Sequence, residues 1–196
     1  MKRFFSIVIL CVMAISLNAF SEEVMTGTKL DLINMDVSLF GVNLKEATRE
    51  RIQQGLKNTN ARILSEGADT FRDDYNTEDF FKGSQTLSFI YTEEGELAYA
   101  VYTFPSNSNV QKKRTLSQIL ENKYGEGTSL EVNGIEMGRE WLFYNGILIS
   151  LEQNPRTNKD YIMYENKEIT TKYISQSGTK QLKILVSEYS APQNAF

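Results

Sequence analysis

The sequence predicts an α+β protein: a largely antiparallel β-sheet of hairpins and a meander, on which two or three amphipathic helices pack. Two Asn-Gly pairs, at 133–134 and 145–146, each lie between alternating apolar residues. This pattern is typical of tight hairpin turns, because both turn residues must accept positive φ. Ser129–Gln153 is therefore expected to be a three-stranded meander with Trp141 facing a core.

Further strands are indicated by alternating apolar residues elsewhere in the chain. A hairpin is predicted over Thr86–Thr92 and Leu97–Phe104, and single strands over Ala61–Leu64, Tyr161–Tyr164 and Gln181–Ser187. Tyrosines on the hairpin arms could form a stacking platform for a small ligand. The more ordinary interpretation, which we favour, is that they line a core with their hydroxyls at its edge.

The first helix is predicted to begin at Asn43, whose side chain can cap free N–H groups, and to run to about Asn58. Arg49 is expected to lie on its solvated side. The apolar residues that share its inner face are Leu44, Ala47, Ile52 and Leu56.

A second helix is predicted between a cap at Ser108 or Asn109 and a stop at Gly125. Its first turns carry the basic run 111–114, which is either a phosphate or nucleic-acid patch or, as is usual, a solvated helix face. Residues 166–176 suit a helix better than a strand. The expected inner face of the second helix is Leu116, Ile119, Leu120 and Tyr124.

The order of these elements is that of two helix-plus-meander units, residues 35–104 and 108–165, with a C-terminal extension over 166–196. Such units suggest a duplication, although the sequence identity between them is too weak to prove one. At the level of architecture the arrangement is similar to small exported inhibitor and binding proteins built from tandem helix-plus-meander units, beta-lactamase inhibitory proteins among them. No motif assigns the chain to that family.

Residues 1–21 are expected to be a secretory signal peptide, because Lys2 and Arg3 precede an apolar run and small residues that allow cleavage. An uncleaved anchor is the alternative. We expect residues 22–196 to be one soluble domain, periplasmic or secreted, without stable membrane insertion after cleavage.

Composition limits the chemistry. The chain has no histidine, and its one cysteine, Cys11, lies in the expected signal peptide. This excludes catalytic triads, Cys-His pairs and zinc sites from the mature chain, and no cofactor or metal is expected. The formal charge of −4 becomes more negative when Lys2 and Arg3 are removed, which disfavours nucleic acid and anionic membranes as partners.

Residues 66–83 are interpreted as a long acidic connection that carries function, with six acidic and two basic residues. Asp74, Asn76 and Glu78 alternate like the start of an EF-hand loop, but Asp79 occupies the position of the required glycine, so no metal site is predicted. The aromatic residues either anchor a basic protein partner or only hold the connection to the domain. The candidate binding residues are Asp69, Phe71, Asp73, Asp74, Tyr75, Glu78, Asp79, Phe80 and Phe81.

The favoured function is that of an exported, non-catalytic binding or inhibitor-type protein of the bacterial cell envelope. An enzyme is less expected, because no residue resembles an activated nucleophile. The alternatives are a carboxylate-based hydrolase of the glycosidase kind and a small-ligand carrier. A hydrolase would need two acidic side chains about 5 to 9.5 Å apart in a cleft.

Overall fold

The computed structural model describes residues 32–67, 70–78, 81–105, 110–132, 135–154 and 159–176, which belong to one compact unit. For residues 110–113, 132 and 135 only the backbone is described. The expected signal peptide and the strand predicted over 181–187 lie outside these ranges.

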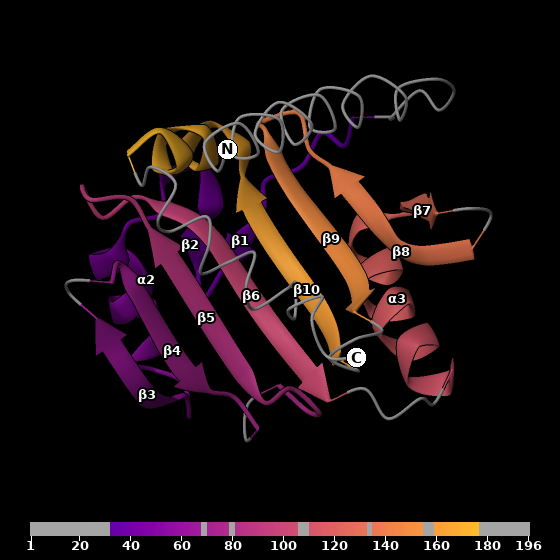
Figure 1. Ribbon diagram of the computed structural model, residues 1–196, viewed down its shortest axis with the longest axis horizontal. Helices are drawn as coiled ribbons and strands as arrows, with labels where there is room; N and C mark the ends of the chain where they lie inside the picture. Colours follow the sequence, from indigo (N-terminus) through magenta and orange to yellow (C-terminus); the bar gives the residue numbers. More distant parts are fainter. Residues whose placement is uncertain are drawn as a thin grey trace, which may run out of the picture. The chain divides into compact units, whose positions relative to one another are not determined.

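An eight-stranded antiparallel sheet dominates the described part of the chain and confirms the predicted α+β class (Figure 1). Its order is β3-β4-β5-β6-β10-β9-β8-β7, so the two meanders β3–β6 and β7–β10 join through their last strands. A two-residue pair, β1 (Ser38–Leu39) with β2 (Val42–Asn43), lies apart from it. The strands of the large sheet are β3 (Arg62–Gly67), β4 (Arg72–Asn76), β5 (Thr86–Tyr91), β6 (Leu97–Pro105), β7 (Thr128–Val132), β8 (Ile135–Leu142), β9 (Ile147–Asn154) and β10 (Lys159–Asn166).

The strand register relates the two meanders. At the central junction Val101 of β6 lies opposite Met163 of β10, and the flanking pairs are Ala100 with Tyr164 and Tyr102 with Ile162. A local two-fold axis at the Val101–Met163 pair relates the two flanking pairs, as it does in any antiparallel strand pair. The duplication itself stays a prediction, because the register describes how the units pair and not how they arose.

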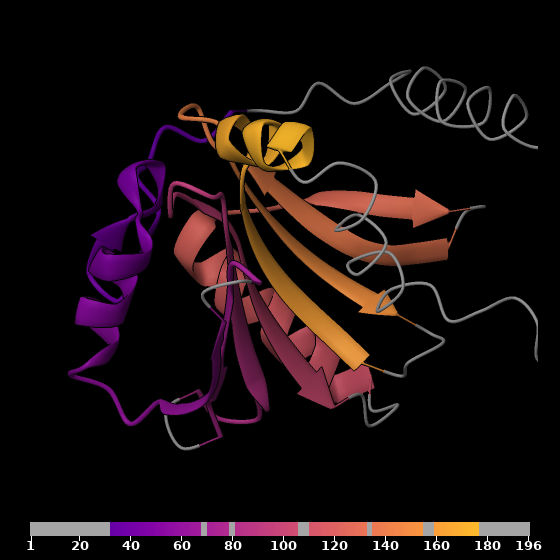
Figure 2. The same cartoon turned by 60° about the vertical axis from the view of Figure 1, so that its left-hand side comes forward.

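Two helices, α2 (Arg49–Leu56) and α3 (Val110–Tyr124), pack on one face of this sheet (Figures 1 and 2). Both helices contribute buried residues to the cluster that holds the helix-facing side chains of β5, β6, β8, β9 and β10. On the opposite face Ile90 and Ala98 form a second cluster with Tyr173, from a helix over residues 167–176 that confirms the favoured prediction for this segment.

The first predicted helix is divided in the structure. Asn43 does cap a turn, but only of the 3-10 helix η1 (Leu44–Glu46), and α2 begins after a second cap, Thr48. The chain is extended between them because its backbone pairs with the β5–β6 turn: Leu97 N–H donates to Ala47 O at 3.0 Å, and Arg49 N–H donates to Gly95 O at 2.9 Å. Tertiary backbone bonds therefore replace one helical turn.

The predicted meander is confirmed, and its tryptophan is part of the core. Trp141 is 1% exposed, and its indole N–H donates to Gly125 O at 2.8 Å. Gly125 has φ +85°, which ends α3 as predicted. The prediction that Ile119 faces inward from the second helix is wrong: Ile119 is 44% exposed, because it lies one position away from the inner row Leu116, Leu120 and Tyr124.

Candidate functional site

The acidic segment 66–83 is not the long connection that was predicted. Its middle is β4, which pairs with β3 on one side and with β5 on the other. Asp73 and Tyr75 point toward the helices and are buried, whereas Asp74 points to the other face. The sequence shows no clean two-residue period here, and acidic residues are depleted in strands, so no strand was predicted.

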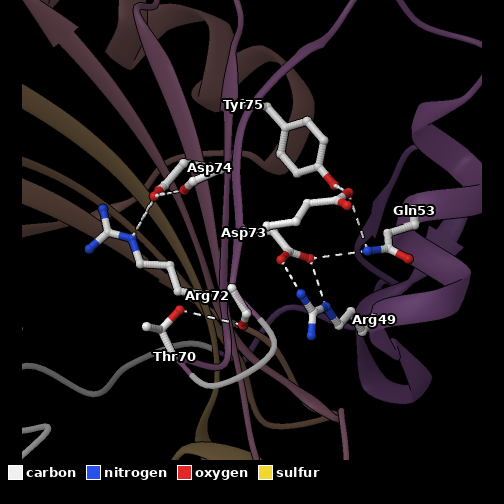
Figure 3. A network of polar contacts seen from close by, with 10 residues as sticks. Arg49, Gln53, Thr70, Arg72, Asp73, Asp74 and Tyr75 are labelled. Atoms are coloured by element: carbon white, nitrogen blue, oxygen red, sulfur yellow. Dashed lines mark hydrogen bonds and ion pairs between the residues drawn. The ribbon is translucent and has the colours of Figure 1, made fainter.

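Asp73 is fully buried under α2, where it accepts two hydrogen bonds from the guanidinium of Arg49. Arg49 Nε lies 2.9 Å from Oδ2, and Nη2 lies 2.5 Å from Oδ1. Hydrogen bonding to Asp73 is the main cause of the raised pKa of Arg49. The expectation that Arg49 is solvated is therefore wrong, because the helix turns this side chain toward the one buried carboxylate of β4 (Figure 3).

Two further polar side chains complete this network. Gln53 donates to Asp73 Oδ2 at 3.3 Å, and the hydroxyl of Tyr75 donates to Glu66 Oε1 at 3.1 Å. Burial raises the pKa of Tyr75 and that of the fully buried Tyr91, over whose ring the Arg49 guanidinium lies at 5.8 Å. The paired carboxylate of Asp73, the amide of Gln53 and the ring of Tyr91 thus hold α2 on the sheet.

Asp74 belongs to a separate network on the face of the sheet that α2 and α3 do not cover. It accepts from Arg72 Nε at 2.9 Å, from Ser88 Oγ at 2.5 Å and from Ser65 Oγ at 3.0 Å. Figure 3 shows Asp73 and Asp74 on opposite sides of β4. Among the predicted binding residues, Asp73 and Asp74 are thus each paired with an arginine of the same domain.

Of the remaining predicted residues, the structure describes Phe71, Glu78 and Phe81, and it places them at different ends of β4. Phe71 precedes β4 with φ 50°, and Phe81 packs edge-on against Tyr102 and Phe104 of β6. Glu78 is exposed. Asp69, Asp79 and Phe80 lie outside the described residues.

An exposed apolar pair lies next to this region and was not predicted as a site. Ile63 and Leu64 of β3 are 61% and 55% exposed, and β3 is an edge of the eight-stranded sheet. The register between β3 and β4 shifts between Ile63 and Ser65, so Leu64 has no Cα partner on β4. The sequence showed only a short apolar strand, and nothing in it indicated which strand would be last in the sheet.

In the second meander, α3 is bridged to β8 by Arg139. This guanidinium donates through Nε to Glu136 Oε1 at 3.0 Å and through Nη1 to Glu121 of α3. The hydrogen bond to Glu136 is the main cause of the raised pKa of Arg139. The side chains of Arg139 and Glu121 are about one-third exposed, at 29% and 31%, so this bridge is open to water.

Neither a cluster of metal ligands nor a membrane-spanning helix is found in the described ranges. No group of three or more Asp and Glu side chains there has the spacing that a metal ion requires. No helix in the same part of the chain combines the length and the apolar character that a transmembrane segment needs.

Comparison with known proteins gives one distant likeness. No protein-family model matches the chain, and no curated protein matches it. A similar solved structure is that of a DUF4309 family protein, YjgB, from Bacillus subtilis, with 13% sequence identity and a TM-score of 0.39. The match covers 67% of this chain and 88% of that chain. A likeness this slight supports no conclusion about fold or function.

Proposed function

We propose that this protein is a non-catalytic binding protein of the bacterial cell envelope, which engages a basic protein partner through Ile63 and Leu64 at the β3 edge. The observation that carries the proposal is the exposure of these two large side chains, at 61% and 55%, on adjacent residues of one edge strand. Export rests on the sequence of residues 1–21.

Side-chain contact suits this edge better than the addition of a partner strand. The bulge at Leu64 interrupts the regular spacing of β3, and bulges are one of the devices that keep edge strands from pairing with other chains. The same bulge leaves two apolar side chains next to each other in water. Apolar anchors of this kind fill pockets at the centre of many protein interfaces.

Two exposed carboxylates against one exposed arginine, Arg62, near the apolar pair support a basic partner. Glu66 lies on the strand itself and is exposed, and Glu78 follows β4 at the end of the sheet where Asn76 pairs with Arg62. These carboxylates can raise the rate of encounter with a positive surface. Asp73 and Asp74 are excluded from this role, since Arg49 and Arg72 neutralise them.

One observation favours the alternative of a carboxylate-based hydrolase. Glu140 of β8 is half-buried, and burial followed by the nearby charge of Glu152 raises its pKa. Glu152 lies on the adjacent strand β9, opposite Gly138, two residues from Glu140, and a pair of neighbouring carboxyl groups of which one is half-buried is the arrangement of an acid catalyst and its partner. Hydrolysis of chromogenic glycosides that is lost in Glu140→Gln would support this alternative, and the absence of any hydrolysis by the wild type would dismiss it.

The binding proposal is tested with surface variants of the full chain produced in its own host. The double variant Ile63→Ser/Leu64→Ser is compared with Ile119→Ser/Ile174→Ser, whose side chains are 44% and 45% exposed on helices. A protein that co-purifies with the wild type is identified and purified, and its dissociation constant is measured for each variant by biolayer interferometry.

We expect the β3 variant to bind at least about tenfold more weakly, since each lost apolar anchor costs about 1 kcal/mol or more, while the helix variant binds like the wild type. Glu66→Gln/Glu78→Gln should slow association at low salt and not at high salt. Equal affinity of the β3 and helix variants, or no reproducible partner for the wild type, would overturn the proposal.

A further inference from the structure

A pocket of about 450 Å³ lies between α3 and the β8–β9 hairpin, far along the sheet order from β3. Its size is within the range of small-molecule sites. Leu151, only 2% exposed, is its one large apolar residue, and the rest of its lining is polar or glycine. The lining residues are Arg114, Ser117, Gln118 and Glu121 from α3, Glu136, Gly138 and Arg139 from β8, and Leu151 from β9.

The contribution of α3 follows from helical periodicity. Arg114, Ser117, Gln118 and Glu121 have the spacing i, i+3, i+4 and i+7, which places them on one stripe of the helix. A basic group therefore lies at one end of the stripe and an acidic group at the other. Seven residues of α-helix separate their Cα atoms by about 10 Å.

The two arginines of the pocket differ in their bonding. Arg139 is held between Glu136 and Glu121, and Glu121 also accepts from Ser117 Oγ at 3.0 Å. Arg114 is exposed and, among the residues that the structure describes, has no ion pair. Its guanidinium fork can thus accept a carboxylate in two parallel hydrogen bonds.

The balance of charge defines the class of ligand. Two arginines and two glutamates give a lining with no net charge, which disfavours phosphate and other multiply charged anions. No aromatic residue lines the pocket, so a sugar would find no ring to stack on. The lining fits a ligand that carries one carboxylate for Arg114 and one ammonium group for the glutamate carboxylates at the other end.

We infer that this pocket binds a short peptide with free termini, with its carboxylate on Arg114 and its ammonium group at Glu121 and Glu136. An extended tripeptide spans about 10 Å, which matches the distance along the helix stripe. The inference does not depend on the proposed β3 contact, because the two sites share no residue.

The test uses trialanine and its two blocked forms, the C-terminal amide and the N-acetyl peptide, in calorimetric titrations of the full chain. Amidation should weaken binding to the wild type about tenfold, and should have no further effect in Arg114→Gln, where the partner of the carboxylate is gone. N-acetylation should likewise lose its effect in Glu121→Gln/Glu136→Gln. Arg51→Gln, a change at an exposed arginine of α2, is the matched control and should bind all three peptides like the wild type.

Thermal melting of each variant checks that it is folded. Trialanine that fails to bind the wild type at 10 mM, a concentration on the order of weak fragment binding, would overturn the inference. So would an amidation effect of equal size in wild type and Arg114→Gln, because the carboxylate would then be recognised elsewhere.

Discussion

Each meander has an ion pair between a helix and its second strand. The two pairs differ in which partner lies on the helix and in how exposed the side chains are. In the first, Arg49 of α2 donates to Asp73 of β4, and the aspartate is fully buried. In the second, Arg139 of β8 donates to Glu121 of α3, and both side chains are about one-third exposed. The first closes the interface between helix and sheet, whereas the second forms part of the wall of a pocket.

The difference shows why charge alone is a poor guide to function in this chain. A buried carboxylate must keep its partner, since an unpaired charge in the interior is very costly. An exposed pair contributes little to stability, so its groups can exchange partners with a ligand at small cost. Exposure, which the sequence does not state, decides which acidic residues can bind something.

The largest effect on stability is expected from a change in the core that both meanders share. Trp141→Ala should lower the free energy of unfolding by about 3 to 5 kcal/mol, because it removes a fully buried aromatic side chain and its hydrogen bond to Gly125. Urea denaturation measures it. A midpoint within error of the wild type would show that Trp141 is not packed as described.

Asp73→Asn should have the next largest effect, a loss of about 3 kcal/mol, because it leaves the guanidinium of Arg49 without its charged partner. Glu78→Gln, an exposed change in the same acidic segment, is the control and should stay within about 0.5 kcal/mol of the wild type. The difference between the two variants follows from the burial of Asp73. Similar urea midpoints for the two variants would show that Asp73 is not buried and paired as described.

Glu121→Gln, the corresponding change in the second meander, should cost less than about 1 kcal/mol, as is usual for an exposed ion pair. The glutamine can still accept from Ser117 and Arg139, so the helix keeps its contacts. A loss as large as that of Asp73→Asn would mean that the pocket wall is structural.

The smallest effect on stability is expected for Glu140, on the face of the sheet that α2 and α3 leave uncovered, and it depends on pH. Burial raises the pKa of Glu140, so its charged form is disfavoured in the folded state. The resulting cost is full at neutral pH and disappears as the pH falls through the folded-state pKa. Glu140→Gln should therefore raise the melting temperature at pH 7 and lose this advantage in acid. A gain independent of pH would show that charge is not its cause.

Much of the fold could be predicted from local patterns, because hairpins and helix ends are determined by nearby residues. The Asn145-Gly146 turn, the β5–β6 hairpin and the stop at Gly125 are examples. The strand β4 could not be predicted in this way. Its buried Asp73 is tolerated because of Arg49, which lies 24 positions earlier in the chain. The pocket could not either, because it depends on how α3 and β8 lie in space.

The measurement that tests the central claim most directly is a pair of double-mutant cycles in urea, one for Arg49 and Asp73 and one for Arg139 and Glu121. Each partner is changed to alanine singly and together, which separates the pairwise coupling from other losses. We predict a coupling of about 2 kcal/mol or more for the buried pair and below about 1 kcal/mol for the open pair. Equal couplings would contradict the assignment of one pair to structure and the other to binding.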